Sequence, residues 1–327
     1  LTSSGAIVST RITVGDGLTE IQGALEVALN KAEVVILTGG LGPTQDDKTR
    51  EAIAGFCKRP LVRDEGLASS LEKHFAPRGP RLVALNEKLA WICEGSEILP
   101  NTKGTAVGTW VEEGRGAIIS LPGVPYEMKI IMQDEVIPRI QSRYEVEPLF
   151  VQWIMTVGQG ESSLSVALKG IEHNMPEGVK LAYLPSLQGV RLRLTSAKEQ
   201  QKDTEKIATD ITERLGSLVY AKKDISLSCI VHEMLIEHGI KMVLAESCTG
   251  GNIMATLVKN PGSSQYLLGG HVVYSNDWKA KEIAVSSELI ESYGAVSEEV
   301  AKAMAEGAIK NANADMSLAV TGIAGPG

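Results

Sequence analysis

The chain has 327 residues, 43% of them hydrophobic and 22% charged, which is the balance of a globular protein with two or three domains. A net charge of −8 gives it no general attraction to phosphate backbones, so we expect no nucleic-acid partner. Four scattered cysteines without a CxxC pair argue against zinc and disulfides, and no apolar run could cross a bilayer, so we expect a cytoplasmic protein with no membrane partner.

The N-terminal part alternates between strand-like and helix-like patterns. Residues 7–14 (IVSTRITV) predict a strand, 18–31 a helix and the apolar run 34–37 a second strand, which together predict a βαβ unit with a buried parallel sheet. A second alternation follows. It predicts helices near 47–57, 64–75 and 124–142, the last with Pro138 near its end, and strands near 106–111 and 117–121.

A glycine-rich loop at residues 38–49 (TGGLGPTQDDKT) comes directly after the apolar strand. Ligands of open α/β sheets bind at such carboxyl ends of strands. Glycines let backbone amides approach a phosphate, and the N-terminus of the following helix favours its negative charge. We therefore expect Gly39, Gly40 and Gly42 to bind a phosphate-bearing substrate.

The same loop carries oxygen ligands. Asp46, Asp47 and Thr49 supply hard oxygens, which suit Mg²⁺ or a similar ion that bridges phosphates. The alternative is that Thr44 and Asp46 only cap the following helix, because Thr and Asp are favoured at that position.

Two further polar loops, at 101–106 (NTKGTA) and 121–128 (LPGVPYEM), also lie at strand ends, so the three loops predict one shared pocket. These three stretches resemble the N-terminal domain of the CinA family, which is similar to molybdopterin-binding proteins. The resemblance implies ADP-ribose pyrophosphatase activity, with ADP-ribose as ligand and a divalent metal, Mg or Co, near the loop at 38–49. Val107 departs from this pattern, since family members usually have proline there.

The pattern changes near residue 150. Strands at 150–157 and 189–195, a helix after Gly160 and a charged helix at 198–214 predict a small α+β connector. The middle module of the CinA family resembles a KH domain, and residues 158–162 (GQGES) occupy the expected place. Because no basic GxxG loop accompanies it, we interpret this module as a spacer that does not bind RNA.

A second α/β pattern begins after residue 224. It predicts helices at 226–238, from about 252 and at 297–311, and strands at 241–245, 272–275 and 316–320. The first of these strands ends in ESCTGG, and a helix follows. A nucleophile on such a turn is exposed, and its oxyanion can use the amides of the turn.

Ser247 is the expected nucleophile, and it needs a base. No histidine forms a triad pattern, so the alternative is a lysine whose pKa is lowered by its surroundings. Lys279 is the candidate, with Tyr274 as a proton relay. The structural alternatives are that Ser247 caps a helix, Tyr274 lies in the core and Lys279 is solvated. Cys248 is a rival nucleophile, unless it is a small buried hydrophobe.

Five motifs in order, at 245–251, 261–264, 274–276, 294–297 and 320–327, resemble the CinA C-terminal domain, known as a nicotinamide-nucleotide amidase. The resemblance implies Ser247 as nucleophile with Tyr274 and Lys279 as its catalytic partners, nicotinamide mononucleotide as substrate, no cofactor for the amidase, and a homodimer. The residues expected to bind the substrate are Thr249, Gly250, Gly251, Asn276, Thr321, Gly322 and Gly325.

The expected fold class is therefore α/β, with two α/β domains joined by a small α+β KH-like module. The N-terminal molybdopterin-binding-like domain is expected over 1–147, the connector over 148–222 and the amidase domain over 223–327, with both outer ends incomplete. The expected function is pyridine-nucleotide recycling, with a second pyrophosphatase activity. The alternatives are a non-catalytic nucleotide-binding or regulatory scaffold, and a protein with the pyrophosphatase alone.

Overall fold

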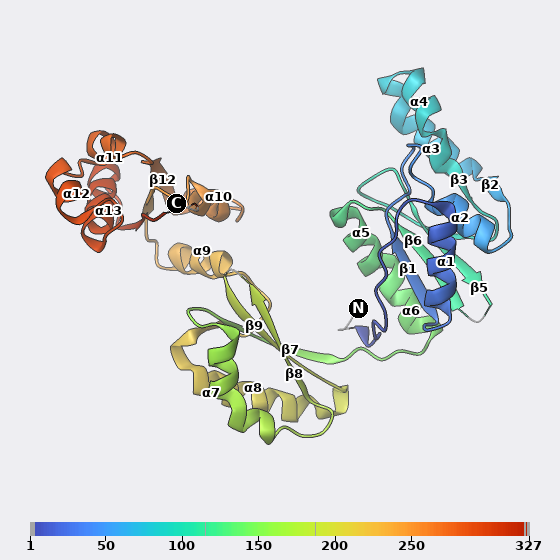
Figure 1. The fold of residues 1–327 in the computed structure, drawn as a ribbon, viewed down its shortest axis with the longest axis horizontal. Coiled ribbons are helices and arrows are strands. Elements are labelled where there is room, and N and C mark those ends of the chain that lie inside the picture. The colour runs from blue at the N-terminus through green and yellow to red at the C-terminus, as the bar shows by residue number, and fades with distance from the viewer. Residues whose placement is uncertain (1–3, 115, 187, 324, 326–327) are drawn as a thin grey trace. The chain divides into compact units, whose positions relative to one another are not determined.

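The computed structural model describes residues 4–114, 116–186, 188–323 and 325. They form two compact units, residues 1–150 and 151–327, each considered by itself below. Both α/β domains and the smaller α+β module are present, so the predicted fold class is confirmed (Figure 1). Among the described residues, no helix is long and apolar enough to span a membrane.

A mixed sheet with the strand order β1-β6-β5-β4 forms the centre of the N-terminal unit (Figure 1). Its strands are β1 (Val34–Thr38), β4 (Glu97–Leu99), β5 (Gly108–Glu113) and β6 (Gly116–Leu121). β1 runs parallel to β6, while β5 and β4 continue antiparallel. β6 is buried along its whole length, as its apolar sequence predicts for a strand covered on both faces.

Helices cover both faces of this sheet. One face packs against α1 (Leu18–Leu29) and α2 (Thr49–Phe56), and the other against α5 (Pro125–Ile131) and α6 (Ile137–Arg143). A π-helical turn, Met132–Val136, joins α5 to α6, so residues 125–143 are helical throughout and the helix predicted at 124–142 is confirmed, with Pro138 in the first turn of α6. The remaining elements of this unit are α3 (Glu65–Phe75), α4 (Pro80–Asn86), β2 (Leu61–Arg63) and β3 (Trp91–Cys93).

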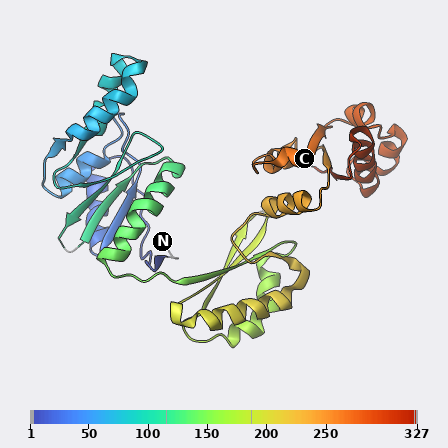
Figure 2. The same cartoon turned by 180° about the vertical axis from the view of Figure 1, so that it is seen from behind.

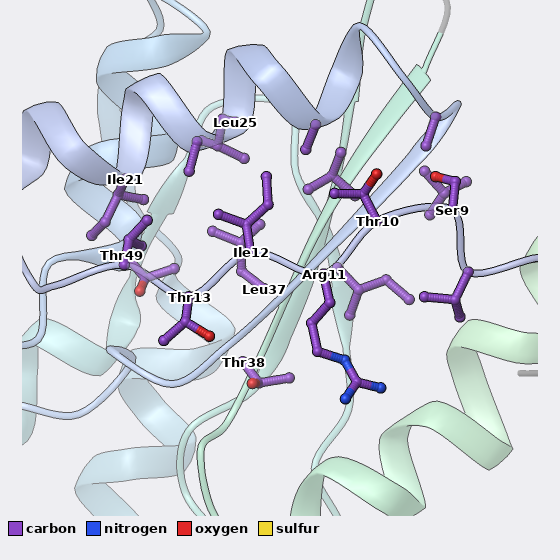
Figure 3. A pocket seen from close by; sticks show the side chains of 18 of the residues that line it. Ser9, Thr10, Arg11, Ile12, Thr13, Ile21, Leu25, Leu37, Thr38 and Thr49 are labelled. Carbon is purple, nitrogen blue, oxygen red and sulfur yellow. The ribbon is translucent and has the colours of Figure 1, made fainter.

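The strand predicted at residues 7–14 is wrong. This segment is extended but belongs to no ladder, and Ile7 is 90% exposed. It runs along the free edge of β1, with a cavity of about 1000 Å³ between them, into which Ile12, Leu25 and Leu37 point (Figure 3). Its β-branched sequence favours a strand, but a strand also needs a hydrogen-bonded neighbour. The predicted βαβ unit therefore does not form.

The middle module is an antiparallel sheet in the order β10-β7-β9-β8, with two helices packed against one face (Figure 2). The predicted strands and helices here are confirmed, and β8 and β10 are additional. The elements are β7 (Phe150–Thr156), α7 (Glu161–His173), β8 (Lys180–Ser186), β9 (Gly189–Ser196), α8 (Gln201–Leu215) and β10 (Val219–Ala221).

The C-terminal domain has a parallel sheet in the order β12-β11-β13. α11, α12 and α13 cover one face of this sheet, and α9 and α10 cover the other (Figure 1). The strands are β11 (Met242–Glu246), β12 (Leu267–Val272) and β13 (Met316–Val320), and the helices are α9 (Leu227–Glu237), α10 (Asn252–Leu257), α11 (Asn276–Ile283), α12 (Ser287–Tyr293) and α13 (Glu298–Ala312).

The strand predicted at 272–275 was placed five residues too late, because β12 begins at Leu267. Two glycines, Gly269 and Gly270, weaken the strand pattern in the sequence. In the fold Gly270 packs closely, since a Cβ atom there would lie 3.2 Å from both Leu244 Cβ and Met254 Sδ. Close packing against β11 and α10 thus hides this strand from sequence reasoning.

Candidate active site

Ser247 lies at the end of β11, the central strand of the C-terminal sheet, on the turn that leads into α10. Its amide donates to the carbonyl of Val320 at 2.9 Å, which ties the turn to the end of β13. The turn then closes through Gly250 and Gly251, with φ angles of +58° and +95° that favour glycine. Ser247 is 5% exposed, so its hydroxyl lies in a largely dry environment.

Lys279 contacts the serine directly. It comes from the first turn of α11, which Ser275 caps by accepting a hydrogen bond from the amide of Trp278. Its Nζ atom donates to Ser247 Oγ at 3.1 Å and to the carbonyl of Tyr274 at 3.2 Å. The side chain is almost completely buried, at 2% exposed.

The electrostatic surroundings favour the neutral amine of this lysine. Burial lowers the pKa of Lys279 below its ordinary value of 10.5, while the thiol of Cys248 acts in the opposite direction. The amine donates hydrogen bonds to a hydroxyl and to a carbonyl, and neither group carries a negative charge. Ser247 and Lys279 therefore form a nucleophile next to an amine that loses its proton more readily than a solvated lysine.

Tyr274 occupies a different position from the one expected. The relay predicted from the sequence requires its hydroxyl between Lys279 and Ser247, but Tyr274 is 68% exposed and contributes its backbone carbonyl instead. Because the lysine reaches the serine directly, no relay is needed. The contact of Tyr274 with the amine is through its backbone carbonyl oxygen.

Hydrogen-bond donors without partners surround the nucleophile. Within the part of the chain that the structure describes, the amides of Cys248 and Thr249 donate to no protein acceptor. The Thr249 hydroxyl is also buried there without a partner. Free amides directly after a nucleophile are the usual donors to an oxyanion in acyl transfer.

Glu246, directly before the nucleophile, was missed by the sequence reasoning. Its carboxylate is 1% exposed and accepts hydrogen bonds from the amides of Gly251, Ile253 and Met254. An N-cap side chain normally accepts from the amide two or three residues later, whereas these donors lie five to eight residues ahead. The only signal in the sequence was a carboxylate at the end of an apolar strand.

The other residues expected to bind substrate lie in different surroundings. Gly322 lies against the turn, since a Cβ atom there would be 3.0 Å from Cys248 Sγ. Thr321 is directed away, because its hydroxyl donates to the carbonyl of Ala295 at 2.7 Å. Asn276 and Gly325 are exposed at the surface. Residues 324, 326 and 327 of the motif at 320–327 lie outside the described residues.

Hydrogen bonds link the three polar loops of the N-terminal domain. The amide of Gly39 donates to the carbonyl of Leu121 at 2.9 Å, which joins the first and third loops. The Asn101 amide group donates to Glu127 Oε2 at 2.6 Å, which joins the second and third. The three loops are therefore adjacent, but the cavity beside β1 is lined by residues of the first loop and by none of residues 101–106 or 121–128.

The three expected metal ligands of the first loop differ in their surroundings. Asp47 accepts bonds from the amide and hydroxyl of Thr44, and Thr49 donates its hydroxyl to the carbonyl of Gly39 at 2.9 Å. Asp46 borders the cavity of Figure 3. Among the described residues, no group of three or more His, Cys, Asp or Glu side chains could hold a metal ion. Two of the three candidate ligands thus stabilise the loop itself, together with the buried Arg50, which donates to the carbonyls of Leu41 and Gly42.

Comparison with known sequences covers almost the whole chain. Residues 1–142 match the family described as probable molybdopterin binding domain, 152–221 the damage-inducible protein CinA KH domain, and 224–327 the CinA C-terminal domain. A CinA-like protein of Chlorobium chlorochromatii is 38% identical over 334 residues, covering 100% of this chain and 79% of that protein. A CinA-like protein of Dictyoglomus turgidum is 37% identical over 330 residues, covering 100% and 80%.

Among solved structures, the crystal structure of the protein CinA from Thermoplasma acidophilum is 33% identical to the matched part of this chain. The match covers 39% of this chain and 72% of that protein, with a TM-score of 0.35. At that score the likeness adds nothing to the geometry of the site described above.

Proposed function

The chain belongs to the CinA family, and on that premise we propose that its C-terminal domain hydrolyses the carboxamide of nicotinamide mononucleotide. The products are nicotinic acid mononucleotide and ammonia, as in pyridine-nucleotide recycling. The observation that supports this proposal is the 3.1 Å contact between Lys279 Nζ and Ser247 Oγ, both nearly buried. A buried amine beside a hydroxyl is what activation of a serine without histidine requires.

The first half of the proposed reaction forms an acyl-enzyme. Neutral Lys279 takes the proton of the Ser247 hydroxyl while Oγ attacks the carboxamide carbon. The carbonyl oxygen becomes an oxyanion, which the free amides of Cys248 and Thr249 stabilise. Protonated Lys279 then gives its proton to the leaving nitrogen, the C–N bond breaks, and ammonia departs.

The second half repeats the same proton transfers with water. Lys279, neutral again, removes a proton from a water molecule, which attacks the acyl carbon. The tetrahedral intermediate collapses, its C–Oγ bond breaks, and the proton on Lys279 returns to Ser247. The carboxylate product leaves with one oxygen from water, so the enzyme regains its starting state without a cofactor in any step.

A non-catalytic scaffold is the alternative that this geometry disfavours. Burying a lysine without a carboxylate partner costs stability, because its charged form loses hydration. A protein that only binds nucleotides has no physical need for such an amine beside a serine hydroxyl. The two explanations predict different outcomes in a simple assay.

The test is ammonia release from nicotinamide mononucleotide by the full chain, with nicotinic acid mononucleotide identified by mass spectrometry. We expect one ammonia for each acid formed, and none from a Ser247→Ala variant at the same concentration. Binding of the nucleotide without release of ammonia would favour the scaffold and contradict the proposed amidase.

A second candidate activity, hydrolysis of ADP-ribose, belongs to the N-terminal domain. It is favoured by the convergence of the three polar loops through the Gly39–Leu121 and Asn101–Glu127 hydrogen bonds. Since two of the three expected metal ligands, Asp47 and Thr49, form hydrogen bonds within their own loop, we derive no metal-dependent step from this arrangement. Release of AMP from ADP-ribose by the full chain tests this candidate.

A further inference from the structure

We propose that Glu246 is a positioning residue for amide hydrolysis, which holds the nucleophile turn in the shape that the oxyanion requires. This inference rests on the proposed amidase function. Glu246 itself is not placed to touch the substrate, because its carboxylate is buried and occupied by three backbone amides. Its effect would reach the reaction through the turn at residues 247–250.

The side chain of Glu246 fixes the far end of the turn. Oε2 accepts from the amides of Gly251 at 3.1 Å and Ile253 at 3.0 Å, and Oε1 accepts from Met254 at 2.8 Å. These amides belong to the start of α10, where helix geometry leaves donors without internal partners. Hydrogen bonds to a carboxylate are roughly twice as strong as neutral ones.

The backbone of Glu246 fixes the near end of the same turn. It is the last rung of β11 in both ladders, opposite Val272 of β12 and Val320 of β13. Its carbonyl also accepts from the amide of Val273 at 2.8 Å. One residue therefore anchors both ends of a four-residue turn that carries Ser247 and the two free amides.

The anchoring matters because the amides of Cys248 and Thr249 have no acceptor among the described residues that would hold them in place. Their directions depend on where the turn begins and ends. A helix start that shifts by a fraction of an ångström would move these donors relative to Ser247 while leaving the fold intact. Catalytic groups misplaced by about 1 Å lose on the order of 10²-fold in rate.

Glu246→Gln is the informative substitution, since it preserves size and leaves one oxygen acceptor. The amide oxygen can serve either Met254 or the pair Gly251 and Ile253, and the NH₂ group then faces the remaining donors. We expect kcat per active site to fall by roughly 10- to 100-fold, while KM changes less than about threefold. Glu291→Gln, an exposed carboxylate on α12, is the matched control and should behave like the unsubstituted chain.

Further measurements separate positioning from a purely structural role. The pH midpoint of kcat/KM should stay unchanged in Glu246→Gln, because the Lys279–Ser247 contact does not involve Glu246. A structural role alone would lower the folded fraction, and with it the number of active sites, but leave kcat per site intact. If the glutamine variant does not fold, Glu246→Asp, which keeps the charge on a shorter side chain, is judged by the same criteria.

The outcomes distinguish this inference from the function it rests on. A kcat within twofold of the unsubstituted chain, or a loss confined to KM, overturns the positioning role and leaves the amidase standing. An unsubstituted chain that releases no ammonia from nicotinamide mononucleotide overturns the amidase, and the role of Glu246 with it.

Discussion

The two glycine-rich turns of this protein, at residues 38–49 and 246–251, look alike in sequence but differ in how their polar groups are used. Each follows a strand of a sheet and leads into a helix. In the N-terminal loop, Asp47, Thr49 and Arg50 form hydrogen bonds with the loop itself. In the C-terminal turn, Ser247 and Lys279 are buried against each other.

The difference lies in the side chains rather than in free amides, because the amides of Gly40 and Leu41 in the N-terminal loop also have no acceptor among the described residues. Around Ser247, two amides and the Thr249 hydroxyl are without protein acceptors among the described residues. Unsatisfied buried donors cost stability, so a fold retains them where a ligand supplies the acceptor. A glycine-rich turn at a strand end is therefore not by itself a catalytic site. Buried, unpaired groups that face it are the better indication.

The largest expected effect comes from removing the nucleophile. Ser247→Ala should lower amide hydrolysis by about 10⁴-fold or more, because no other group near the turn can form the acyl-enzyme with comparable geometry. Cys248→Ala should retain most of the activity, and steady-state ammonia release from both variants makes the comparison. An inactive Cys248→Ala beside an active Ser247→Ala would make the cysteine the nucleophile.

Replacing the base should have a smaller effect. Lys279→Arg keeps a positive charge but cannot lose its proton near neutral pH, so we expect a loss of about 10²- to 10⁴-fold. The measurement is kcat/KM of the unsubstituted chain and of Lys279→Arg. Circular dichroism checks that both proteins are folded. Full activity in the arginine variant would leave Lys279 with an electrostatic role only.

The pH dependence follows from the direction of the lysine pKa. Since burial lowers the pKa of Lys279, kcat/KM should rise with pH as the amine loses its proton, with the midpoint of the rise below the ordinary lysine value of 10.5. The rising limb should be absent from Lys279→Arg. An activity that falls with rising pH over this range would mean that the protonated amine is the active form.

Much of the fold could be predicted from the sequence because its signals are local. The apolar run before Glu246 and the glycines after Ser247 gave a strand, a turn and a helix in the right places. Three features could not be predicted, because each depends on a distant partner. They are the missing neighbour of residues 7–14, the outward direction of the Tyr274 side chain and the reach of Glu246 to amides up to eight residues ahead.

The smallest expected effect tests whether the two turns are independent. Asp46→Ala with Asp47→Ala removes carboxylates from the N-terminal loop, and hydrogen bonds that shape this loop come from within its own domain. The amidase groups likewise come from one sheet and its helices, so the double variant should keep amide hydrolysis within a few-fold. It should lose ADP-ribose hydrolysis, measured as AMP release from the same preparation.

EDTA should leave the amidase unchanged, because a serine–lysine mechanism uses no metal. A double variant that folds normally yet loses the amidase would show that the two turns are coupled, and each turn could then no longer be treated as a separate site.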